Sequence, residues 1–514
     1  MIDALLLEAE TLTELVRLSC ASAEDERRFQ PIVDRLRAVA SLAPTAPLAA
    51  EQELEQLAVR LRRALLARAH DHSDPHFRSP VHGPARPLPS GDTSGHIYER
   101  SANPTALEGR VAKAAPPPRG WRADHVMFSS GTAAISGLLQ CYRSMVRGSE
   151  RDPLRAGVWG GYFETDMLFE LLKSGAFTWD AVPDVISAVG GGQHDLLFIE
   201  PVRYTWDLTT LDLPAFVRAW RARSPRRTRV LVFDTTLASF TWPSARVLES
   251  LHDGSPLLVI EVRSGLKLDQ QGLELANLGI VSIYSCHEDE GTPTAEQFGQ
   301  YLRLIRSITG TALSMDAMAV LDTPFMAAPV WVARHAGQVF LNNQTLAAAL
   351  AQESGLFSKI AHPSLTVASG PLRHAPFVVC QLAEDHIANH GFLLAVVREE
   401  VRRRGIRLDW GSSFGFRSHR WETIIPRVQD RRGLFKIAMG SRSGPSFEAA
   451  VELFRQLARY RDFDALRRAY PGLIALDLMA MAGPEPSASA VDSPTVRDRE
   501  TSLLVDAQRG GGAS

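Results

Sequence analysis

Lys267 directly follows a buried apolar segment, where a long cationic side chain is costly to place. Residues 257–262 read LLVIEV, a nearly continuous apolar run that is typical of a strand covered on both faces. Ser264 and Gly265 lie between this segment and the lysine. Because removing an ammonium group from water costs free energy, we expect Lys267 to have a chemical use. A partly buried lysine has a lowered pKa and can attack a carbonyl carbon.

A carboxylate and a small-residue turn follow two other apolar segments. Asp234 comes after RVLVF, at the edge of a dry core where a carboxylate needs a cationic or hydrogen-bonding partner; a helix cap is the alternative. The segment HVMF runs into Ser129, Ser130, Gly131 and Thr132 just before a predicted helix. Such a turn lets a phosphate approach the backbone N–H groups of the helix, although an ordinary serine-capped turn has the same pattern.

These groups together predict a site for pyridoxal phosphate. Lys267 would form a Schiff base with the aldehyde, and Asp234 would keep the pyridine nitrogen protonated so that the ring accepts electrons. The turn at residues 129–132 would anchor the phosphate. Trp159, which ends the segment AGVW just before two glycines, would hold the ring plane, although Trp usually packs in a core.

The segments that carry these residues alternate between strand-like and helical patterns. This alternation predicts a mainly parallel α/β sheet. Ligands collect at the carboxyl ends of the strands in open parallel sheets, so the predicted site groups belong at that edge. The strand candidates are HVMFSS, AGVWGG, DLLFIEP, RVLVFDTT, PLLVIEV and LGIVSIYS.

Composition divides the chain into five segments. Leucines at three- and four-residue spacing predict a helical N-terminal extension over residues 1–70, and a linker or arm rich in Pro, His and Gly follows at 71–95. We expect the large domain at 96–355 and a smaller C-terminal α+β domain at 356–475, with PFVVCQLA and LFKIAMG as strands. Residues 476–514 are predicted to be a disordered tail.

Charge and cysteine content narrow the possible functions. The 514 residues are 22% charged and carry a formal net charge of −2, so no overall field favours nucleic acid or a membrane surface. Four widely spaced cysteines without CxxC pairing predict reduced thiols in a cytoplasmic protein. We expect neither a signal peptide nor a membrane span. No metal site is expected, because the histidines around the linker have no element to fix a ligand geometry. They are His70, His72, His76 and His82.

Several segments resemble, in the same order, those of the Cys/Met-metabolism pyridoxal-phosphate enzymes. This group includes cystathionine γ-synthase, the cystathionine lyases and methionine γ-lyase. The segments are YERSANPTALE, SSGTAAI, WGGYF, FIEPVRYTWDL, VFDTTLAS, VRSGLK, LRLIRSITGTALSMDAMAVL and GSSFGF. The resemblance spans about residues 90–465 and implies the fold type I architecture. In that architecture a large domain contains a mainly parallel sheet of the seven-stranded type, and a smaller α+β domain follows it.

The resemblance also implies roles for individual residues. Tyr98 and Arg100 would bind the phosphate of a neighbouring subunit's cofactor, which requires a homodimer or homotetramer with shared active sites. The turn at residues 130–132 would contact the phosphate, with Ser264 adding its hydroxyl. Lys267 would hold the cofactor covalently.

Three departures from the family pattern affect the cofactor site. The family's stacking tyrosine falls on Trp159, which cannot relay a proton, so Tyr162 becomes the candidate hydroxyl. Tyr204 stands in place of the asparagine that contacts the 3-oxygen of the cofactor, and could donate the same hydrogen bond. Leu266 replaces the threonine before the lysine.

A fourth departure concerns the substrate carboxylate. The family's arginine for this group falls on Lys436, with Arg442 six residues later. Ser413 and one of these cations are the candidates for holding the carboxylate. A point charge in place of a fork-shaped donor is not a conservative change.

The expected activity is γ-replacement or γ-elimination on an amino acid with a leaving group at Cγ. Substrate candidates are activated homoserines, thioether amino acids and S-adenosylmethionine, in a specialised biosynthetic pathway. Within the same fold, an aminotransferase or an aldol- or β-lyase is the alternative. From another class, the chain would be a catalytically weak paralogue that serves as an assembly subunit.

Overall fold

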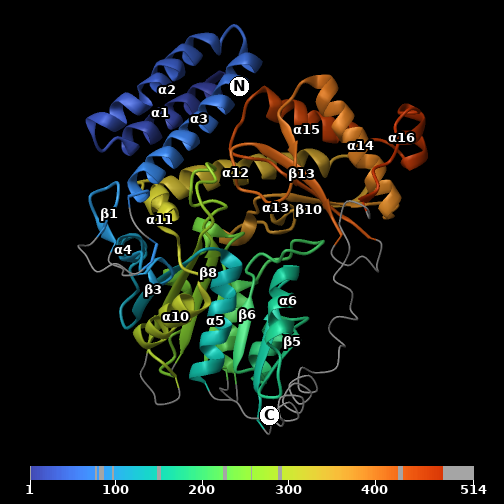
Figure 1. Ribbon diagram of the computed structural model, residues 1–514. Coiled ribbons are helices and arrows are strands. Elements are labelled where there is room, and N and C mark those ends of the chain that lie inside the picture. The colour runs from blue at the N-terminus through green and yellow to red at the C-terminus, as the bar shows by residue number, and fades with distance from the viewer. Residues whose placement is uncertain are drawn as a thin grey trace, which may run out of the picture.

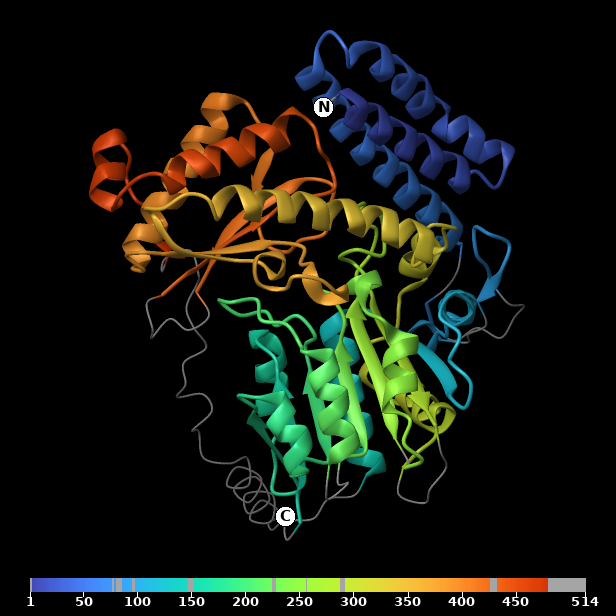
Figure 2. The same cartoon turned by 180° about the vertical axis from the view of Figure 1, so that it is seen from behind.

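The computed structural model describes residues 2–75, 78–79, 86–94, 98–146, 152–223, 228–255, 257–286, 292–425 and 432–478. Figure 1 shows a bundle of N-terminal helices (blue) and a small C-terminal part (orange) above a larger α/β part. Figure 2 shows the same arrangement from behind. The predicted tail falls almost wholly outside the described residues, as do His76 and His82.

In the described residues, seven strands form the large sheet in the order β3-β9-β8-β7-β6-β4-β5. The strands are β3 (Arg122–Phe128), β4 (Leu154–Trp159), β5 (Phe177–Ala181), β6 (Leu196–Ile199), β7 (Val230–Asp234), β8 (Leu258–Ser264) and β9 (Gly279–Ser285). All neighbours are parallel except β9, which is antiparallel to β3 and β8. The predicted mainly parallel sheet is confirmed. β5 was not predicted, because FTWDA is short and its last two residues are exposed at the sheet edge.

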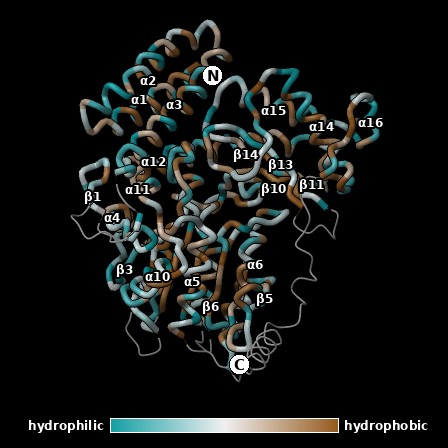
Figure 3. The backbone as a smooth tube through the Cα atoms, viewed as in Figure 1, coloured by the Kyte–Doolittle hydropathy of each residue, from teal (hydrophilic) through white to brown (hydrophobic). Residues whose placement is uncertain are grey.

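Helices cover both faces of this sheet. Successive side chains on a strand point to opposite faces, so a strand that is apolar throughout presents apolar side chains to the helices on either side. Val259 packs with one layer of helices and Ile260 with the other. One layer contains α7 (Val185–Gly191), α8 (Leu213–Ala222) and α9 (Ser244–Leu251); the other contains α5 (Gly131–Met145), α6 (Phe163–Leu172) and α10 (Ala295–Thr309). Figure 3 shows apolar residues along the strands between them. α4 (Thr105–Ala114) packs beside β3.

The small C-terminal part has a sheet of five described strands in the order β10-β11-β14-β13-β12. The strands are β10 (Phe357–Ala361), β11 (Val378–Leu382), β12 (Leu408–Trp410), β13 (His419–Ile424) and β14 (Leu434–Ala438). The helices that pack with it are α12 (Pro329–Leu350), α13 (Pro363–Thr366), α14 (Ile387–Arg404), α15 (Pro445–Ala458) and α16 (Phe463–Ala469). Of these, α12 lies within the residues that the sequence assigned to the large domain. The sequence predicted β11 and β14. It did not predict β13, HRWETI, because charged residues interrupt its apolar pattern.

The N-terminal bundle consists of α1 (Ile2–Ser19), α2 (Ala23–Leu42) and α3 (Pro47–Ser73). Its leucines share one apolar core with residues of the large part, including Leu273, Leu275 and the segment around α11 (Met315–Leu321). Two short strands follow, β1 (Arg86–Pro87) and β2 (Thr93–Ser94).

No group of metal-binding side chains occurs among the described residues. His70 and His72 lie in the last turn of α3. None of the helices in the described ranges combines the length and apolar character that a membrane crossing requires.

Candidate active site

A cavity of about 800 Å³ is lined both by the carboxyl ends of the large sheet's strands and by the small part. It brings together most of the residues predicted as site residues. Those lining it are Ser130, Gly131, Thr132, Tyr162, Tyr204, Asp234, Ser264, Lys267, Ser413 and Lys436. Of the predicted residues that the structure describes, Tyr98, Arg100, Trp159 and Arg442 are not part of the lining.

Lys267 lies three residues beyond the end of β8, and its Nζ donates to the Ser413 hydroxyl of the small part. Burial, followed by the nearby charge of Lys436, lowers the pKa of Lys267 to about 8. Its Nζ lies 5.5 Å from the centroid of the Phe414 ring. Near pH 8 a large share of such an amine is neutral, so Lys267 can act as a nucleophile and as a base.

Asp234 ends β7, the strand next to β8. Its Oδ1 accepts the backbone N–H of Thr236 at 2.9 Å, and burial raises its pKa. Within the described part of the chain, no lysine or arginine forms an ion pair with it. A buried carboxylate in this position favours a ligand that brings a positive charge or a proton donor.

The first turn of α5 forms a further part of the cavity lining. Ser130 caps the helix by accepting the Ala133 N–H at 3.0 Å. The first N–H groups of a helix have no partner within it, and the helix dipole favours an anion there. A Cβ on Gly131 would lie only 3.1 Å from Ser264 Cβ, so α5 and β8 approach each other closely and leave little room for a larger residue. The turn and Ser264 could hold a phosphate.

The turn after β4 places Tyr162, and not Trp159, in the cavity. Trp159 is 6% exposed and packs in the core on one face of the sheet, with the Arg203 guanidinium 5.1 Å from its ring. Tyr162 packs edge-on against Tyr204, with centroids 5.8 Å apart, and hydrogen-bonds Glu164. The ring contact that the sequence assigned to Trp159 is therefore available to Tyr162.

Glu200 holds this turn in place, a role that the sequence analysis missed. Its carboxylate accepts the N–H groups of Gly161 at 3.0 Å, Tyr162 at 3.0 Å and Tyr204 at 2.9 Å. Burial and then the like charge of Asp234 raise the pKa of Glu200 to about 7. Its position directly after a buried strand, as for Asp234, was the available signal.

Lys436, on β14, is 1% exposed and forms an ion pair with Glu422 of β13. Its Nζ also donates to Tyr204 Oη at 3.0 Å and lies 5.3 Å from the Phe377 ring centroid. Burial lowers the pKa of Lys436, and Glu422 opposes this shift. The predicted cation is thus present in the cavity, where a carboxylate of the protein already pairs with it.

The remaining predicted residues lie elsewhere. Arg442 is 3% exposed, and its Nε is 3.9 Å from Glu8 Oε1 in the N-terminal bundle, so the structure does not bring it to the cavity. Tyr98 and Arg100 are both exposed, with the guanidinium 4.8 Å from the tyrosine ring.

The chain is unusually poor in lysine. It has five lysines, of which the two that line the cavity are partly or fully buried and the other three are exposed. The exposed ones are Lys113, Lys173 and Lys359. Because desolvation favours the neutral amine, Lys267 and Lys436 are chemically distinct from these three.

No protein-family model matches the chain, and no curated protein matches it by sequence. Among solved structures it is similar to MetB from Corynebacterium glutamicum, at 17% identity and TM-score 0.51 over 71% of this chain and 87% of that one. It is similar to CalE6, a methionine γ-lyase from Micromonospora echinospora, at 17% identity and TM-score 0.51 over 77% and 98%. The chain has the fold type I architecture. Yeast cystathionine γ-lyase gives 16% identity and TM-score 0.51 over 75% and 92%.

The similarity to these structures thus confirms the fold type I architecture that the sequence resemblance implied. The cavity lies where ligands bind in such sheets, at the carboxyl ends of the strands. Its residues fit pyridoxal phosphate: the α5 turn for the phosphate, Asp234 for the pyridine nitrogen and Lys267 for the aldehyde. The Tyr162 ring could support the ring plane.

Proposed function

We propose that this chain is a pyridoxal-phosphate-dependent enzyme that acts on an amino acid with a leaving group at Cγ. The observation that carries the proposal is that Lys267 and Asp234 line one cavity into which the α5 N-terminus opens. These three features match the three chemical ends of the cofactor. When bound, pyridoxal phosphate supplies an electron sink for negative charge on a substrate carbon.

The chain's own residues would bind the cofactor and move protons. Asp234 would accept the pyridine N–H and keep that nitrogen protonated, since its own buried carboxylate has no basic partner in the described chain. Lys267 would remove the Cα proton and deliver it to neighbouring carbons, because its pKa of about 8 makes both states accessible. Ser413, which accepts from Lys267 Nζ, would orient the amine.

The proposed reaction is γ-replacement or γ-elimination. Loss of a Cγ substituent requires proton transfers at both Cα and Cβ, which one mobile amine can perform from one face of the substrate. Activated homoserines, thioether amino acids and S-adenosylmethionine carry suitable leaving groups. The names of the methionine γ-lyase and of the cystathionine γ-lyase support this choice.

The proposal includes a homo-oligomer with shared active sites. Tyr98 and Arg100 are exposed and away from this chain's own cavity, in keeping with contacts to a cofactor in a second copy. We also place the enzyme in the cytoplasm, in line with its four free cysteines.

Borohydride reduction followed by peptide mapping tests the covalent step. After incubation with pyridoxal phosphate, the cofactor should become fixed to Lys267 and to none of the other four lysines. Lys267→Arg should remain unlabelled, whereas the exposed-site control Lys113→Arg should label like wild type. A wild-type protein without label at Lys267 would refute the proposal.

A substrate panel tests the reaction class. Homoserine esters, cystathionine, methionine and S-adenosylmethionine should be assayed for release of the Cγ group together with a keto acid and ammonia, or for its exchange by an added thiol. Amine transfer to an added keto acid, without loss of the Cγ group, would replace the proposed reaction by that of an aminotransferase.

A further inference from the structure

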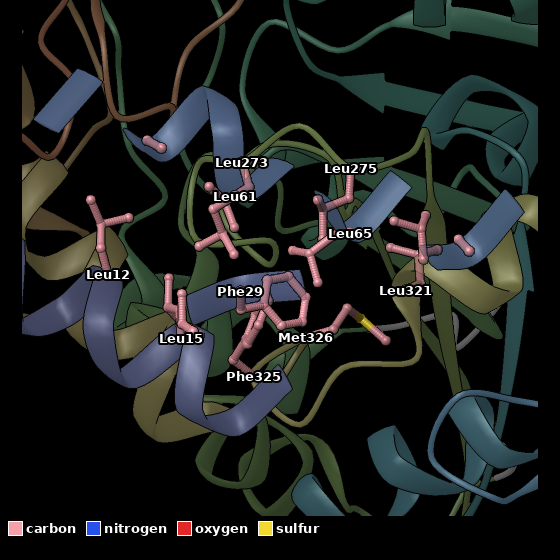
Figure 4. Close-up of a cluster of buried hydrophobic side chains, with 14 of the residues drawn as sticks. Leu12, Leu15, Phe29, Leu61, Leu65, Leu273, Leu275, Leu321, Phe325 and Met326 are labelled. Carbon is pink, nitrogen blue, oxygen red and sulfur yellow. The ribbon is translucent and has the colours of Figure 1, made fainter. Parts of the chain in front are cut away.

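The N-terminal bundle packs against the segment that directly follows Lys267. Leu273 and Leu275 insert into the bundle's apolar core, where they belong to the same buried cluster as Leu61 and Leu65 of α3. Figure 4 shows these leucines together in that core. Residues six and eight positions after the lysine are therefore held by helices from the start of the chain.

This segment has a strained backbone. Gln271 and Glu274 have φ values of 55° and 50°, in the left-handed region that residues other than glycine rarely adopt. Gly272, at φ 67°, lies so close to the small part that a Cβ would be 2.6 Å from Arg417 N. A backbone of this kind persists only when surrounding contacts fix it.

Arginine side chains supply those contacts. Arg62 of α3 donates to the Glu274 carbonyl oxygen at 3.0 Å, and Arg417 Nη1 donates to the Gln271 carbonyl oxygen at 3.0 Å. Arg420 pairs with the Glu274 carboxylate at 2.7 Å. The carbonyl groups of both strained residues thus accept hydrogen bonds from guanidinium groups, one from the bundle and one from the small part.

Glu8 of α1 fixes Arg417 in turn. Arg417 donates Nε to Glu8 Oε1 at 3.0 Å and Nη2 to Oε2 at 2.6 Å, and both side chains are at most 8% exposed. Burial would raise the pKa of Glu8, yet Arg417 and then Arg442 hold it below its ordinary value. Such a paired, buried and bidentate contact defines one geometry.

Arg417 belongs to the loop that carries Ser413. Gly415 of this loop lies against the lysine's own backbone, since a Cβ there would be 2.8 Å from the Lys267 carbonyl oxygen. Arg417 therefore joins two backbone segments, one carrying Lys267 and one carrying Ser413, and those two side chains hydrogen-bond each other.

We propose that the N-terminal bundle is a structural part of the active site and that Glu8 is its positioning residue, which through Arg417 fixes the Lys267 and Ser413 segments against each other. Glu8 does not line the cavity and contacts neither substrate nor cofactor. The inference rests on the proposed function only in naming Lys267 as the reactive amine.

Lysine titration in the cofactor-free protein tests this role. Brief reductive methylation with formaldehyde and cyanoborohydride across a pH series, quantified by peptide mass, gives the midpoint at which each amine becomes reactive. Wild-type Lys267 should show a midpoint near pH 8. In Glu8→Gln, the loosened segments admit water, and the midpoint should rise by about one pH unit. The exposed lysines serve as internal standards.

Three further variants separate positioning from general stability. Glu14→Gln removes an exposed ion pair on the same helix and should leave the Lys267 midpoint unchanged. Glu8→Asp keeps the charge on a shorter side chain, so its Lys267 midpoint should lie between those of Glu8→Gln and wild type. Arg62→Gln removes one hydrogen bond to Glu274. It should raise the Lys267 midpoint by less than Glu8→Gln does. It also keeps the inference testable if Glu8→Gln does not fold.

An unchanged Lys267 midpoint in folded Glu8→Gln and in Arg62→Gln would overturn the inference, whatever happens to their melting temperatures. Because methylation needs no cofactor, this result is distinct from failure of the proposed function. That failure would instead appear as absence of borohydride labelling in the wild type.

Discussion

Glu422 lies directly opposite Lys436 on neighbouring antiparallel strands, and their charged groups pair in the wall of the cavity. Glu422 thereby neutralises the cation before any substrate enters. A carboxylate that bound at Lys436 would share the ammonium group with Glu422 and with Tyr204, which already accepts one of its N–H groups. The strand register thus sets the charge that a substrate meets.

Replacing Glu422 by Gln should increase the preference of the cavity for carboxylates. The ammonium of Lys436 then lacks its partner, which we expect to cost about 3 kcal/mol of stability. The affinity ratio between a free amino acid and its amide should rise about tenfold. Calorimetric titration of both ligands measures this ratio, with Lys436→Met as the opposite control. An unchanged ratio would show that Lys436 does not meet the carboxylate.

Asp234→Asn should separate stability from activity. The buried carboxylate is unfavourable without a cofactor, as its raised pKa indicates, and Asn can still accept the Thr236 N–H. The cofactor-free variant should therefore be as stable as wild type or about 1 kcal/mol more stable. Turnover should fall about a hundredfold or more, because the pyridine nitrogen loses the negatively charged partner that keeps it protonated. Urea unfolding and steady-state assays check both, and full turnover in the variant would contradict the assignment.

Tyr162 and Trp159 should differ in their effect on cofactor binding. Tyr162→Ala removes a ring that lines the cavity, and the dissociation constant for pyridoxal phosphate should rise about tenfold. Trp159→Phe alters a core residue and should lower the melting temperature while leaving that constant nearly unchanged. Fluorescence titration with the cofactor distinguishes the two. Equal loss of affinity in both variants would favour a stacking role for Trp159.

Glu200 should make the stability of the cofactor-free protein depend on pH. Its pKa is about 7 in the folded state against an ordinary value of 4.5, so the folded state binds the proton more tightly. Its contribution is therefore full below about pH 4.5 and is lost as the pH rises through about 7.

Glu200→Gln lacks this titration and provides the control. It should be less stable than wild type at pH 5, because a carboxyl group that accepts three N–H groups is lost. At pH 8 the difference in free energy of unfolding should narrow by about 2 kcal/mol. Urea unfolding at both pH values measures it, and parallel pH profiles for the two proteins would disprove the raised pKa.

The sequence predicted those site residues whose position depends on a single strand. Asp234, Ser264 and Lys267 follow apolar runs, and the carboxyl ends of parallel strands meet at one edge of a sheet. The same reasoning locates the α5 turn. Continuous apolar segments made these strands visible, whereas the charged residues of β13 concealed that strand and with it Glu422.

The sequence did not predict the features that depend on how distant segments pack. The resemblance aligned Trp159 with a stacking ring, but the direction of its side chain depends on the turn that Glu200 holds, and this turn brings Tyr162 into the cavity instead. Its spacing from Lys436 made Arg442 a reasonable candidate for binding the substrate carboxylate. Its guanidinium lies beside Glu8, more than four hundred residues earlier in the chain, and no local sequence pattern predicts that contact.

The contact between Glu8 and Arg417 joins residues 409 positions apart. During synthesis the helices of the bundle leave the ribosome well before Arg417, which follows Glu8 by 409 positions. Leu61 and Leu65 must likewise wait for Leu273 and Leu275. The nascent chain therefore exposes an apolar helix surface for much of translation, when aggregation is a hazard. The packing of α1 against the segment around Arg417 is consequently a late event in folding.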